Sequence, residues 1–298
     1  MIKTLDDISS VLVVGAGTLG SRIALRCALD GYVVKVYDLS QEQLAAAQNN
    51  HAYLVKVLLR DSKVSAEQVE QAKANLSFTT DIELATTDVD LVSESIVENI
   101  DVKRAFYADF APRLEKGVVV TTNTSFLMPS KIADCLPEPE LFCGFHFHDV
   151  FNQVVVDVMP HPDTAIWVND LLMEFGCSIN QIPVFIRKEN PGYIFNSIFG
   201  QILRQSLVLF VDGVGSVEDI DRSFMGNFGT MAGPFGMLDQ IGFDTAWHIM
   251  SVDQDADSQK AAKLLKSYID DGKLGFKTGQ GFYSYPRPAF TQENFLRG

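Results

Sequence analysis

Residues 11–20 read VLVVGAGTLG, an apolar run followed directly by glycines in the spacing GxGxxG. The apolar run favours a β-strand, and the amphipathic segment 19–29 behind it favours a helix. In such a strand–turn–helix unit Gly15 allows the tight turn, Gly17 lets the backbone approach a pyrophosphate, and Gly20 lets the helix pack close to the strand. The stretch therefore predicts a dinucleotide site rather than an ordinary glycine-containing loop.

The next apolar run, 33–37, ends at Asp38. We expect the Asp38 carboxylate to accept hydrogen bonds from both ribose hydroxyls of an adenosine and to repel a 2′-phosphate. The backbone N–H groups at Thr18 and Leu19 open the helix and face the phosphates together with the positive end of its dipole. The pattern predicts NAD, and not NADP, as the cofactor.

Composition limits the class of protein. The chain has 298 residues, of which 47% are hydrophobic, so it can bury a large core and is long enough for two domains. Its net charge of −14 makes nucleic acid and anionic membrane surfaces poor partners. No apolar run approaches the about 20 residues of a membrane span, and the first residues lack the pattern of a signal peptide. The four cysteines have no paired or metal-ligating spacing, which predicts reduced thiols, no metal site and a cytoplasmic location.

Strands and helices alternate along the first part of the chain, which predicts a mostly parallel, doubly wound sheet of the Rossmann type. Beyond Lys188 the strand pattern stops and helices follow. We therefore expect an NAD-binding domain at 1–188 and an all-helical domain for substrate and dimerisation at 189–298. The expected strands are 11–14, 33–37, 76–78, 89–93, 117–122, 141–147 and 154–159, and the expected helices include 41–61, 101–114, 164–175, 193–212, 217–224, 234–251 and 256–271.

Hydride transfer to NAD requires a group that exchanges the alcohol proton, and histidine is suited to this because its pKa lies near neutrality. Of the five histidines, only His146 and His148 lie at the carboxyl end of an expected sheet strand, where ligands bind in open α/β sheets. Strand periodicity places both on one face. The pattern alone does not choose between them, and a hydrogen-bonded core histidine is the alternative.

The chain resembles the L-3-hydroxyacyl-CoA dehydrogenases, including the bacterial 3-hydroxybutyryl-CoA enzymes. The resemblance covers nearly the whole chain in seven blocks that occur in order. These are 14–20 (VGAGTLG), 94–99 (ESIVEN), 123–125 (NTS), 144–147 (GFHF), 190–196 (NPGYIFN), 233–239 (GPFGMLD) and 272–283 (GKLGFKTGQGFY).

This resemblance implies that His146 is the catalytic base and that Ser125 and Asn196 flank the reacting oxygen. It further implies that Glu98 and Lys103 contact the nicotinamide half of NAD. Each residue also has a simpler interpretation. Ser125 could cap a helix near Pro129, Asn196 could be an inert helix residue, and Glu98 and Lys103 could be a solvated charge pair.

The chain departs from the family pattern around the histidine. The family has His-Phe-Phe followed by Asn-Pro. This chain has His148 in place of the last, apolar residue of that first motif, and Asp149 and Val150 in place of Asn-Pro. The family glutamate that partners the histidine corresponds here to Asp157, which is one methylene shorter. A carboxylate there would orient the imidazole, with Asp149 as the alternative partner. The altered turn is similar to that of a diketo-ester reductase branch of the family.

Binding of CoA is the second open point. Lys56, Arg60 and Lys63 recur at helical spacing and could meet CoA phosphates. A solvated helix face is the alternative, and Asp61 among them favours it.

The sequence thus predicts an NAD-dependent oxidoreductase of fatty acid metabolism that interconverts 3-hydroxyacyl-CoA and 3-oxoacyl-CoA. The alternatives are a 3-hydroxy acid or 3-oxo ester reductase that needs no CoA and, less favoured, a non-catalytic NAD-binding protein of the crystallin kind. The resemblance implies a homodimer through the helical domain, with the apolar segments 198–210 and 234–247 as interface material.

Overall fold

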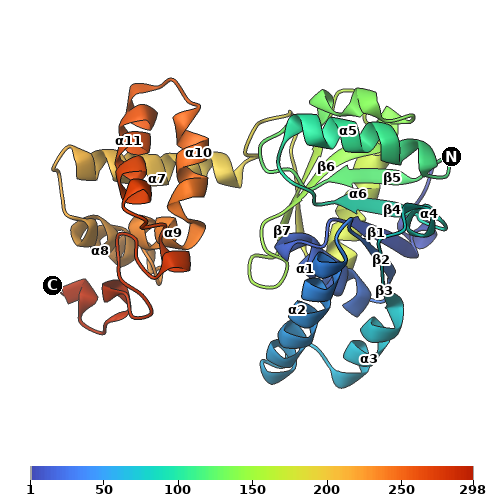
Figure 1. Cartoon of the computed structure of the whole chain (residues 1–298), viewed down its shortest axis with the longest axis horizontal. Coiled ribbons are helices and arrows are strands. Elements are labelled where there is room, and N and C mark those ends of the chain that lie inside the picture. Colours follow the sequence, from blue (N-terminus) through green and yellow to red (C-terminus); the bar gives the residue numbers. More distant parts are fainter. Residues whose placement is uncertain (1, 298) are drawn as a thin grey trace. The chain divides into compact units, whose positions relative to one another are not determined.

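The computed structural model describes residues 2–297 and forms two compact units, Met1–Ile194 and Phe195–Gly298 (Figure 1). The first unit holds every strand of the sheet, and the second is built from helices. The domain boundary expected after residue 188 falls between the last strand and the first helix of the second unit, and it stays a prediction.

The first unit is built on an eight-stranded sheet in the order β3-β2-β1-β4-β5-β6-β7-β8. All neighbouring strands are parallel except β6 and β7, which are antiparallel. Because the strand order reverses between β1 and β4, the carboxyl ends of these strands leave the crevice in which doubly wound folds bind ligands. The strands are β1 (Ser10–Val14), β2 (Val33–Tyr37), β3 (Leu76–Thr79), β4 (Leu91–Glu94), β5 (Val119–Thr122), β6 (Phe142–Phe147), β7 (Val155–Pro160) and β8 (Ile182–Phe185).

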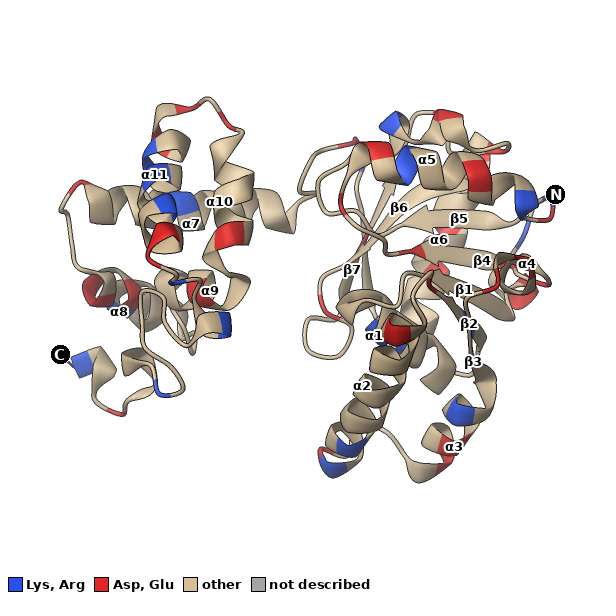
Figure 2. Ribbon diagram, in the orientation of Figure 1, with Lys and Arg blue, Asp and Glu red and all other residues tan. Residues whose placement is uncertain are grey.

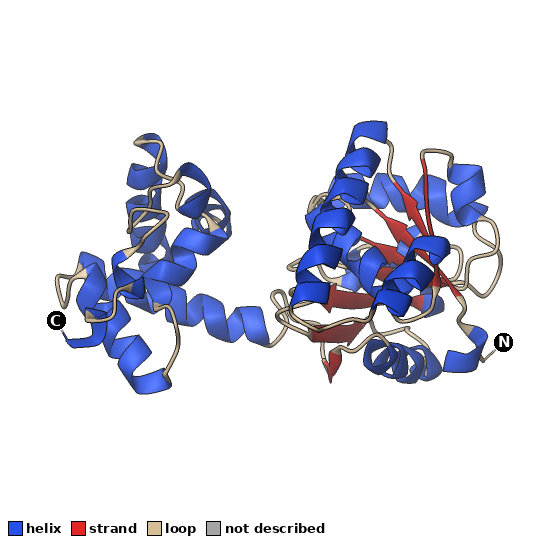
Figure 3. Ribbon diagram, turned by 90° about the horizontal axis from the view of Figure 1, so that it is seen from below, coloured by secondary structure: helices blue, strands red, loops and turns tan. Residues whose placement is uncertain are grey.

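Helices cover both faces of this sheet (Figure 3). One face packs against α1, α2, α3 and α6, and residues such as Val13, Ile23 and Phe175 form its core. The other face packs against α4 and α5 through Leu12 and Tyr107. The helices are α1 (Thr18–Leu29), α2 (Gln41–Arg60), α3 (Ala66–Asn75), α4 (Ile82–Thr86), α5 (Ile100–Phe110) and α6 (Ile166–Ser178).

The second unit consists of α7 (Phe195–Val211), α8 (Val217–Phe228), α9 (Pro234–Ile241), α10 (Phe243–Ser251) and α11 (Ala256–Asp270). Leu207, Phe235 and Leu265 are fully buried in its core. The single helix expected over 234–251 is wrong, because Gly242 adopts a φ of 92° that no helix continues. Over the described residues, no helix combines the length and the apolar character that crossing a membrane requires.

The expected fold class and the expected strands are confirmed. The strand β8 was missed, because Pro183 within the short run Ile182–Phe185 argues against a strand interior. The structure resolves the conflict by placing β8 last in the strand order, at the edge of the sheet beside β7. Edge positions tolerate a proline, since one side of an edge strand makes no ladder hydrogen bonds.

Candidate active site

The candidate site lies along the carboxyl ends of the sheet strands. Gly15 follows β1, Asp38 follows β2, Ser95 follows β4 and Asn123 follows β5. His146 is the last residue but one of β6. The Gly15 N–H donates to the Tyr37 carbonyl at 2.8 Å, which joins the ends of β1 and β2. Residues that are far apart in the sequence thereby meet at one edge.

The glycine turn has the shape that a pyrophosphate requires. A Cβ on Gly20 would lie 2.0 Å from the Gly15 carbonyl oxygen, and a Cβ on Gly15 would lie 2.7 Å from the Ser95 oxygen. A Cβ on Gly17, in contrast, would meet no heavy atom within 4 Å. Two glycines therefore serve chain packing, while Gly17 borders open space where α1 begins with Thr18 and Leu19. Since the first N–H groups of a helix have no intrahelical partners, this space suits a phosphate.

The Asp38 carboxylate is fixed at the mouth of this turn. Its Oδ2 accepts from the Ala16 N–H at 2.8 Å and its Oδ1 from the Ser40 N–H at 2.9 Å. Each oxygen keeps a further lone pair for a ribose hydroxyl. The glycine turn and Asp38 together fit the adenosine and pyrophosphate parts of NAD.

His146 lies directly opposite Asp157 in the antiparallel β6–β7 pair. Its Nδ1 is 3.2 Å from Asp157 Oδ2, and both residues are almost fully buried. Side chains opposite each other in such a ladder are close enough that the shorter aspartate reaches the imidazole directly. Because a carboxylate only accepts hydrogen bonds, Nδ1 carries the hydrogen and the Nε2 lone pair is left to accept a proton. Burial lowers the pKa of His146, and the hydrogen bond to Asp157 acts in the opposite direction.

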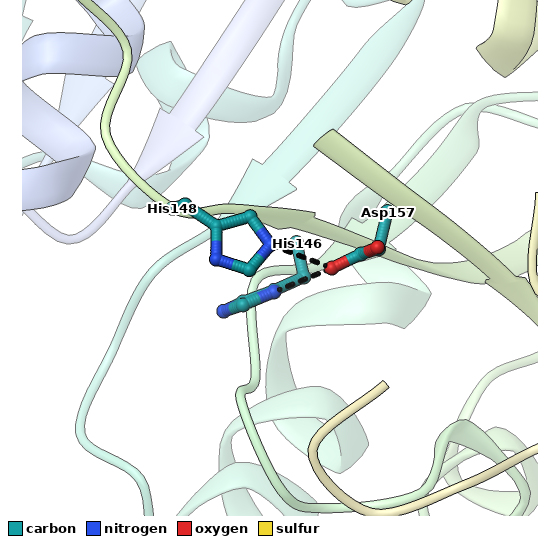
Figure 4. Close-up of side chains that lie close together, drawn as sticks. All are labelled: His146, His148 and Asp157. Atoms are coloured by element: carbon teal, nitrogen blue, oxygen red, sulfur yellow. Dashed lines mark hydrogen bonds and ion pairs between the residues drawn. The ribbon is translucent and has the colours of Figure 1, made fainter. Parts of the chain in front are cut away.

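His148 shares the same carboxylate oxygen. Its Nε2 lies 2.8 Å from Asp157 Oδ2, closer than the His146 nitrogen, and both rings point at that oxygen (Figure 4). Burial acts to raise the pKa of Asp157, but hydrogen bonds from the two histidines outweigh it, so the carboxyl has a lowered pKa. The two histidines thus lie on one face, as strand periodicity predicts.

Ser125 completes a chain of three side chains, in which Ser125 contacts His146 and His146 contacts Asp157. Its Oγ lies 3.1 Å from His146 Nε2, on the side of the ring opposite Asp157. The alternative in which Ser125 caps a helix is wrong, because the short helix Pro129–Lys131 begins after Met128 and has no side-chain cap. A hydroxyl, an imidazole and a carboxylate in this order can withdraw a proton from a bound alcohol.

Glu98 holds the loop that carries Ser125. Its Oε1 accepts from the backbone N–H groups of Ser125 and Phe126, both at 2.9 Å, and from the Thr124 hydroxyl. Asn123 adds a link to the histidine strand, since its Oδ1 accepts from the Phe147 N–H at 2.7 Å. Glu98 therefore contacts the neighbours of the candidate base and is not merely solvated.

Lys103 is buried, with 1% of its side chain exposed, and its Nζ donates to Glu94, whose side chain is fully buried. Glu94 also accepts from the Tyr107 hydroxyl at 3.0 Å and from the Thr122 hydroxyl at 2.7 Å. Glu98 lies farther from Lys103, at 3.9 Å. The expected alternative of a solvated Glu98–Lys103 pair is therefore wrong, and the principal partner is Glu94, to which sequence reasoning gave no role.

Tyr193 is a second residue that sequence reasoning missed. Its ring stacks on His146 with centroids 4.7 Å apart and an interplanar angle of 13°, and its hydroxyl donates to the Thr124 carbonyl at 2.9 Å. Its backbone has a φ of 53°, in the left-handed region. Asp157 and Ser125 contact the ring nitrogens of His146, and the stacked Tyr193 ring restricts the motion of the imidazole from one of its faces.

The remaining expected residues lie elsewhere. Asp149 forms an ion pair with Arg22 of α1 and accepts from the N–H of Phe151, so it engages partners other than His146. Asn196 lies in the first turn of α7, in the second unit, and its role stays a prediction.

The basic residues expected to meet CoA lie at the end of α2 and just beyond it, where blue segments gather in Figure 2. Arg60 donates to Asp61 at 2.8 Å, and Lys63 donates to the Phe151 carbonyl at 3.4 Å. Lys56 is exposed. Two of the three charges therefore already have partners within the chain.

Comparisons with known proteins agree with this geometry. Residues 10–190 match the family model of the 3-hydroxyacyl-CoA dehydrogenase NAD-binding domain, and residues 192–285 match the model of its C-terminal domain. A probable 3-hydroxyacyl-CoA dehydrogenase of Caenorhabditis elegans is 32% identical over 94% of this chain and 94% of that protein.

Two solved structures are similar throughout. A diketoreductase is 33% identical with a TM-score of 0.86, covering 93% of this chain and 99% of that one. The (S)-3-hydroxybutyryl-CoA dehydrogenase of Ralstonia eutropha is 26% identical with a TM-score of 0.86, covering 94% and 100%. From the two family models, the glycine turn with Asp38 and the identity to curated relatives, the chain belongs to the 3-hydroxyacyl-CoA dehydrogenase family of NAD-binding oxidoreductases.

Proposed function

We propose that this enzyme interconverts the 3-hydroxyacyl and 3-oxoacyl groups of a CoA thioester. The observation that carries the proposal is the chain of contacts from Ser125 Oγ through His146 to Asp157, at the strand edge that also holds the glycine turn. These three side chains can accept the proton of an alcohol. The glycine turn would bind NAD, which accepts the hydride.

Bound NAD supplies the acceptor for the hydride from C3. The chain's own residues transfer the proton: His146 Nε2 accepts it from the 3-hydroxyl, while Nδ1 keeps its own hydrogen and donates a hydrogen bond to Asp157 Oδ2. The charge that forms on the imidazole is stabilised by the Asp157 carboxylate. The stacked Tyr193 ring and Asp157 hold His146 so that Nε2 stays aimed at the reacting oxygen.

When the 3-oxo group is reduced, negative charge develops on its oxygen, and hydrogen-bond donors at that oxygen stabilise the charge. Ser125 Oγ is 3.1 Å from His146 Nε2 and can serve as one donor once substrate is bound. We assign the Asn196 amide as the second. Glu98 positions the loop of Ser125 and Phe126 by accepting from their backbone N–H groups, and with Lys103 it would contact the nicotinamide half of a bound cofactor.

A second candidate substrate is a 3-hydroxy acid or 3-oxo ester without CoA. Three observations favour it. His148 and Asp157, next to His146, depart from the family pattern. Arg60 and Lys63 already have partners within the chain, and the chain is similar to a diketoreductase. Exposed Lys56, with Arg60 and Lys63, would supply CoA phosphate contacts in the first candidate.

A steady-state panel with NADH distinguishes these substrates. Acetoacetyl-CoA, longer 3-oxoacyl-CoAs, the free acids and 3,5-dioxo esters are compared by kcat/KM, and free CoA is tested as a competitor. A preference for thioesters together with competition by CoA supports the first candidate. Oxo esters preferred without CoA competition support the second, and no NADH oxidation with any of them contradicts both and favours a non-catalytic NAD-binding protein.

We also propose that the enzyme is a cytoplasmic homodimer that associates through its helical unit. Exposed apolar side chains there include Ile198 at 59%, Phe228 at 71% and Met231 at 92%, more than a solvated surface needs. The four cysteines are free, which fits a reducing compartment. Light scattering coupled to gel filtration tests the dimer, and a monomer at micromolar concentration contradicts it.

A further inference from the structure

Two imidazoles and one carboxylate converge beside the candidate base. One possible ligand atom from each of His146, His148 and Asp157 lies within 4.8 Å of the other two, and both rings contact Asp157 Oδ2 (Figure 4). Two imidazoles with one carboxylate form a donor set that binds zinc and related divalent transition metals, whereas calcium and magnesium prefer oxygen ligands alone. We propose that these three residues form a reversible binding site for a zinc-class cation, distinct in purpose from the proton transfer described above.

The spacing of the donor atoms suits such an ion. A tetrahedral ion with ligand bonds of about 2.0–2.1 Å holds its ligand atoms about 3.3 Å apart. The Nδ1–Oδ2 distance of His146 and Asp157 is 3.2 Å, and the Nε2–Oδ2 distance of His148 and Asp157 is 2.8 Å. Modest separation of the side chains therefore admits the ion between them, and a water or a substrate oxygen supplies the fourth ligand.

The surroundings hold the ligands in place. His146 and Asp157 are opposite each other in the β6–β7 ladder, and the His148 N–H donates to the Val155 carbonyl at 3.4 Å at its end. The other ring nitrogen of His146 contacts Ser125 Oγ, as the second nitrogen of a metal-bound histidine usually contacts a polar group. His146 and Asp157 are 3% and 1% exposed, so a bound ion is shielded from bulk water.

No spacing of ligands in the sequence indicates this site, which explains why none was expected. His146 and His148 are two positions apart, and Asp157 joins them only through the register of an antiparallel strand pair. His148 is the residue that distinguishes the cluster from a simple histidine–carboxylate pair.

A bound ion would inhibit the proposed reaction. When a metal occupies Nδ1 of a neutral imidazole, the ring proton moves to Nε2, and Nε2 then cannot accept the proton of an alcohol. No covalent bond of the substrate changes in this step. Inhibition depends on the proposed role of His146, whereas binding of the ion does not.

Binding is tested by calorimetric titration of the purified full chain with Zn²⁺. We compare the wild type with His148→Gln, which keeps an amide donor toward Asp157 but is a poor ligand, and with His248→Gln, which removes an exposed histidine of α10. We expect one Zn²⁺ per chain in the wild type and in His248→Gln, and at least tenfold weaker binding in His148→Gln. Equal affinity in the wild type and His148→Gln, as Zn²⁺ on the exposed Cys177 would give, or no binding by any of them, overturns the proposal.

Three further measurements test the site. Asp157→Asn removes a different ligand with little change of volume and should weaken Zn²⁺ binding to a similar extent, which also covers the case in which His148→Gln does not fold. Co²⁺ in place of Zn²⁺ should give the visible absorption of a four-coordinate ion without a thiolate band. Rates measured with Zn²⁺, each relative to the same variant without metal, should fall at least tenfold in the wild type and recover with a chelator. If both ligand variants bind Zn²⁺ as tightly as the wild type, or if Co²⁺ gives a thiolate band, the proposed site is wrong.

Discussion

Asp157 lies opposite His146 in the β6–β7 ladder, and one carboxylate oxygen of Asp157 contacts both His146 and His148. The strand register, not the length of the side chain, brings the carboxylate to the imidazole. An aspartate can therefore fulfil the orienting role at this position, and the hydrogen it accepts fixes which nitrogen of His146 is free to act.

Replacement of Asp157 by Asn should lower activity while leaving cofactor binding intact. The amide keeps the size of the carboxylate but removes the charge that stabilises the imidazolium form of His146. We expect kcat to fall at least about tenfold, a loss of about 1.4 kcal/mol in transition-state stabilisation. The dissociation constant of NADH, measured by fluorescence titration, should barely change. A variant with wild-type kcat would show that Asp157 does not support the base.

Removal of either histidine should separate their roles in turnover. His146→Ala should lower kcat by about 10²–10⁴, the usual contribution of a positioned general base. His148→Ala should cost far less, because Ser125 contacts His146 and the Asp157 carboxylate remains available to it. Steady-state kinetics of both variants in metal-free buffer measure this. The opposite order would assign the base to His148.

Asp38 should make the enzyme prefer NADH to NADPH, because its carboxylate repels a 2′-phosphate. Asp38→Asn keeps an acceptor for the Ala16 N–H and removes the charge. We expect the ratio of kcat/KM for NADH over NADPH to fall about fivefold or more, since one unit-charge contact at about 4 Å in water is worth about 1 kcal/mol. Equal use of both cofactors by the wild type would contradict the assignment.

Local sequence patterns determine the cofactor half of the site. The glycine turn and Asp38 occupy one continuous strand–turn–helix–strand unit, so spacing alone predicts how they meet. The sequence indicates Asp157 as the partner of His146 only through the resemblance to the family, with Asp149 as the alternative, and the antiparallel β6–β7 register that places Asp157 opposite His146 is seen only in the structure.

Two residues around the base could not be predicted in this way. Tyr193 stacks on His146 from a position with a φ of 53°, which a bulky residue rarely adopts and which no local pattern announces. Glu94 ends an apolar strand and looks like an ordinary polar terminus. Only the packing of α5 on the sheet brings Lys103 and Tyr107 to it, and this depends on tertiary structure.

The buried Glu94–Lys103 pair should be important for stability. Lys103→Met would leave the Glu94 carboxylate buried with only the hydroxyls of Tyr107 and Thr122 and the Ile96 N–H as donors. We expect a loss of about 3–5 kcal/mol in the free energy of unfolding, as is typical when one partner of a buried ion pair is removed. Adding Glu94→Gln to Lys103→Met should recover part of the loss, because no unpaired charge remains. Urea denaturation of both variants measures this, and a double variant no more stable than Lys103→Met would contradict a buried charge as the cause.

Gly17 and Gly20 should respond in opposite ways to the same added methyl group. A Cβ on Gly20 would lie 2.0 Å from the Gly15 carbonyl oxygen, so Gly20→Ala must displace backbone and should destabilise the fold by about 1–3 kcal/mol or more. A Cβ on Gly17 would meet no heavy atom within 4 Å, so Gly17→Ala should fold with wild-type stability. Its methyl group would instead occupy the space for the pyrophosphate and should weaken NADH binding at least about tenfold. Thermal denaturation and NADH titration of the two variants test both halves, and a Gly17→Ala protein that binds NADH as tightly as the wild type would place the pyrophosphate elsewhere.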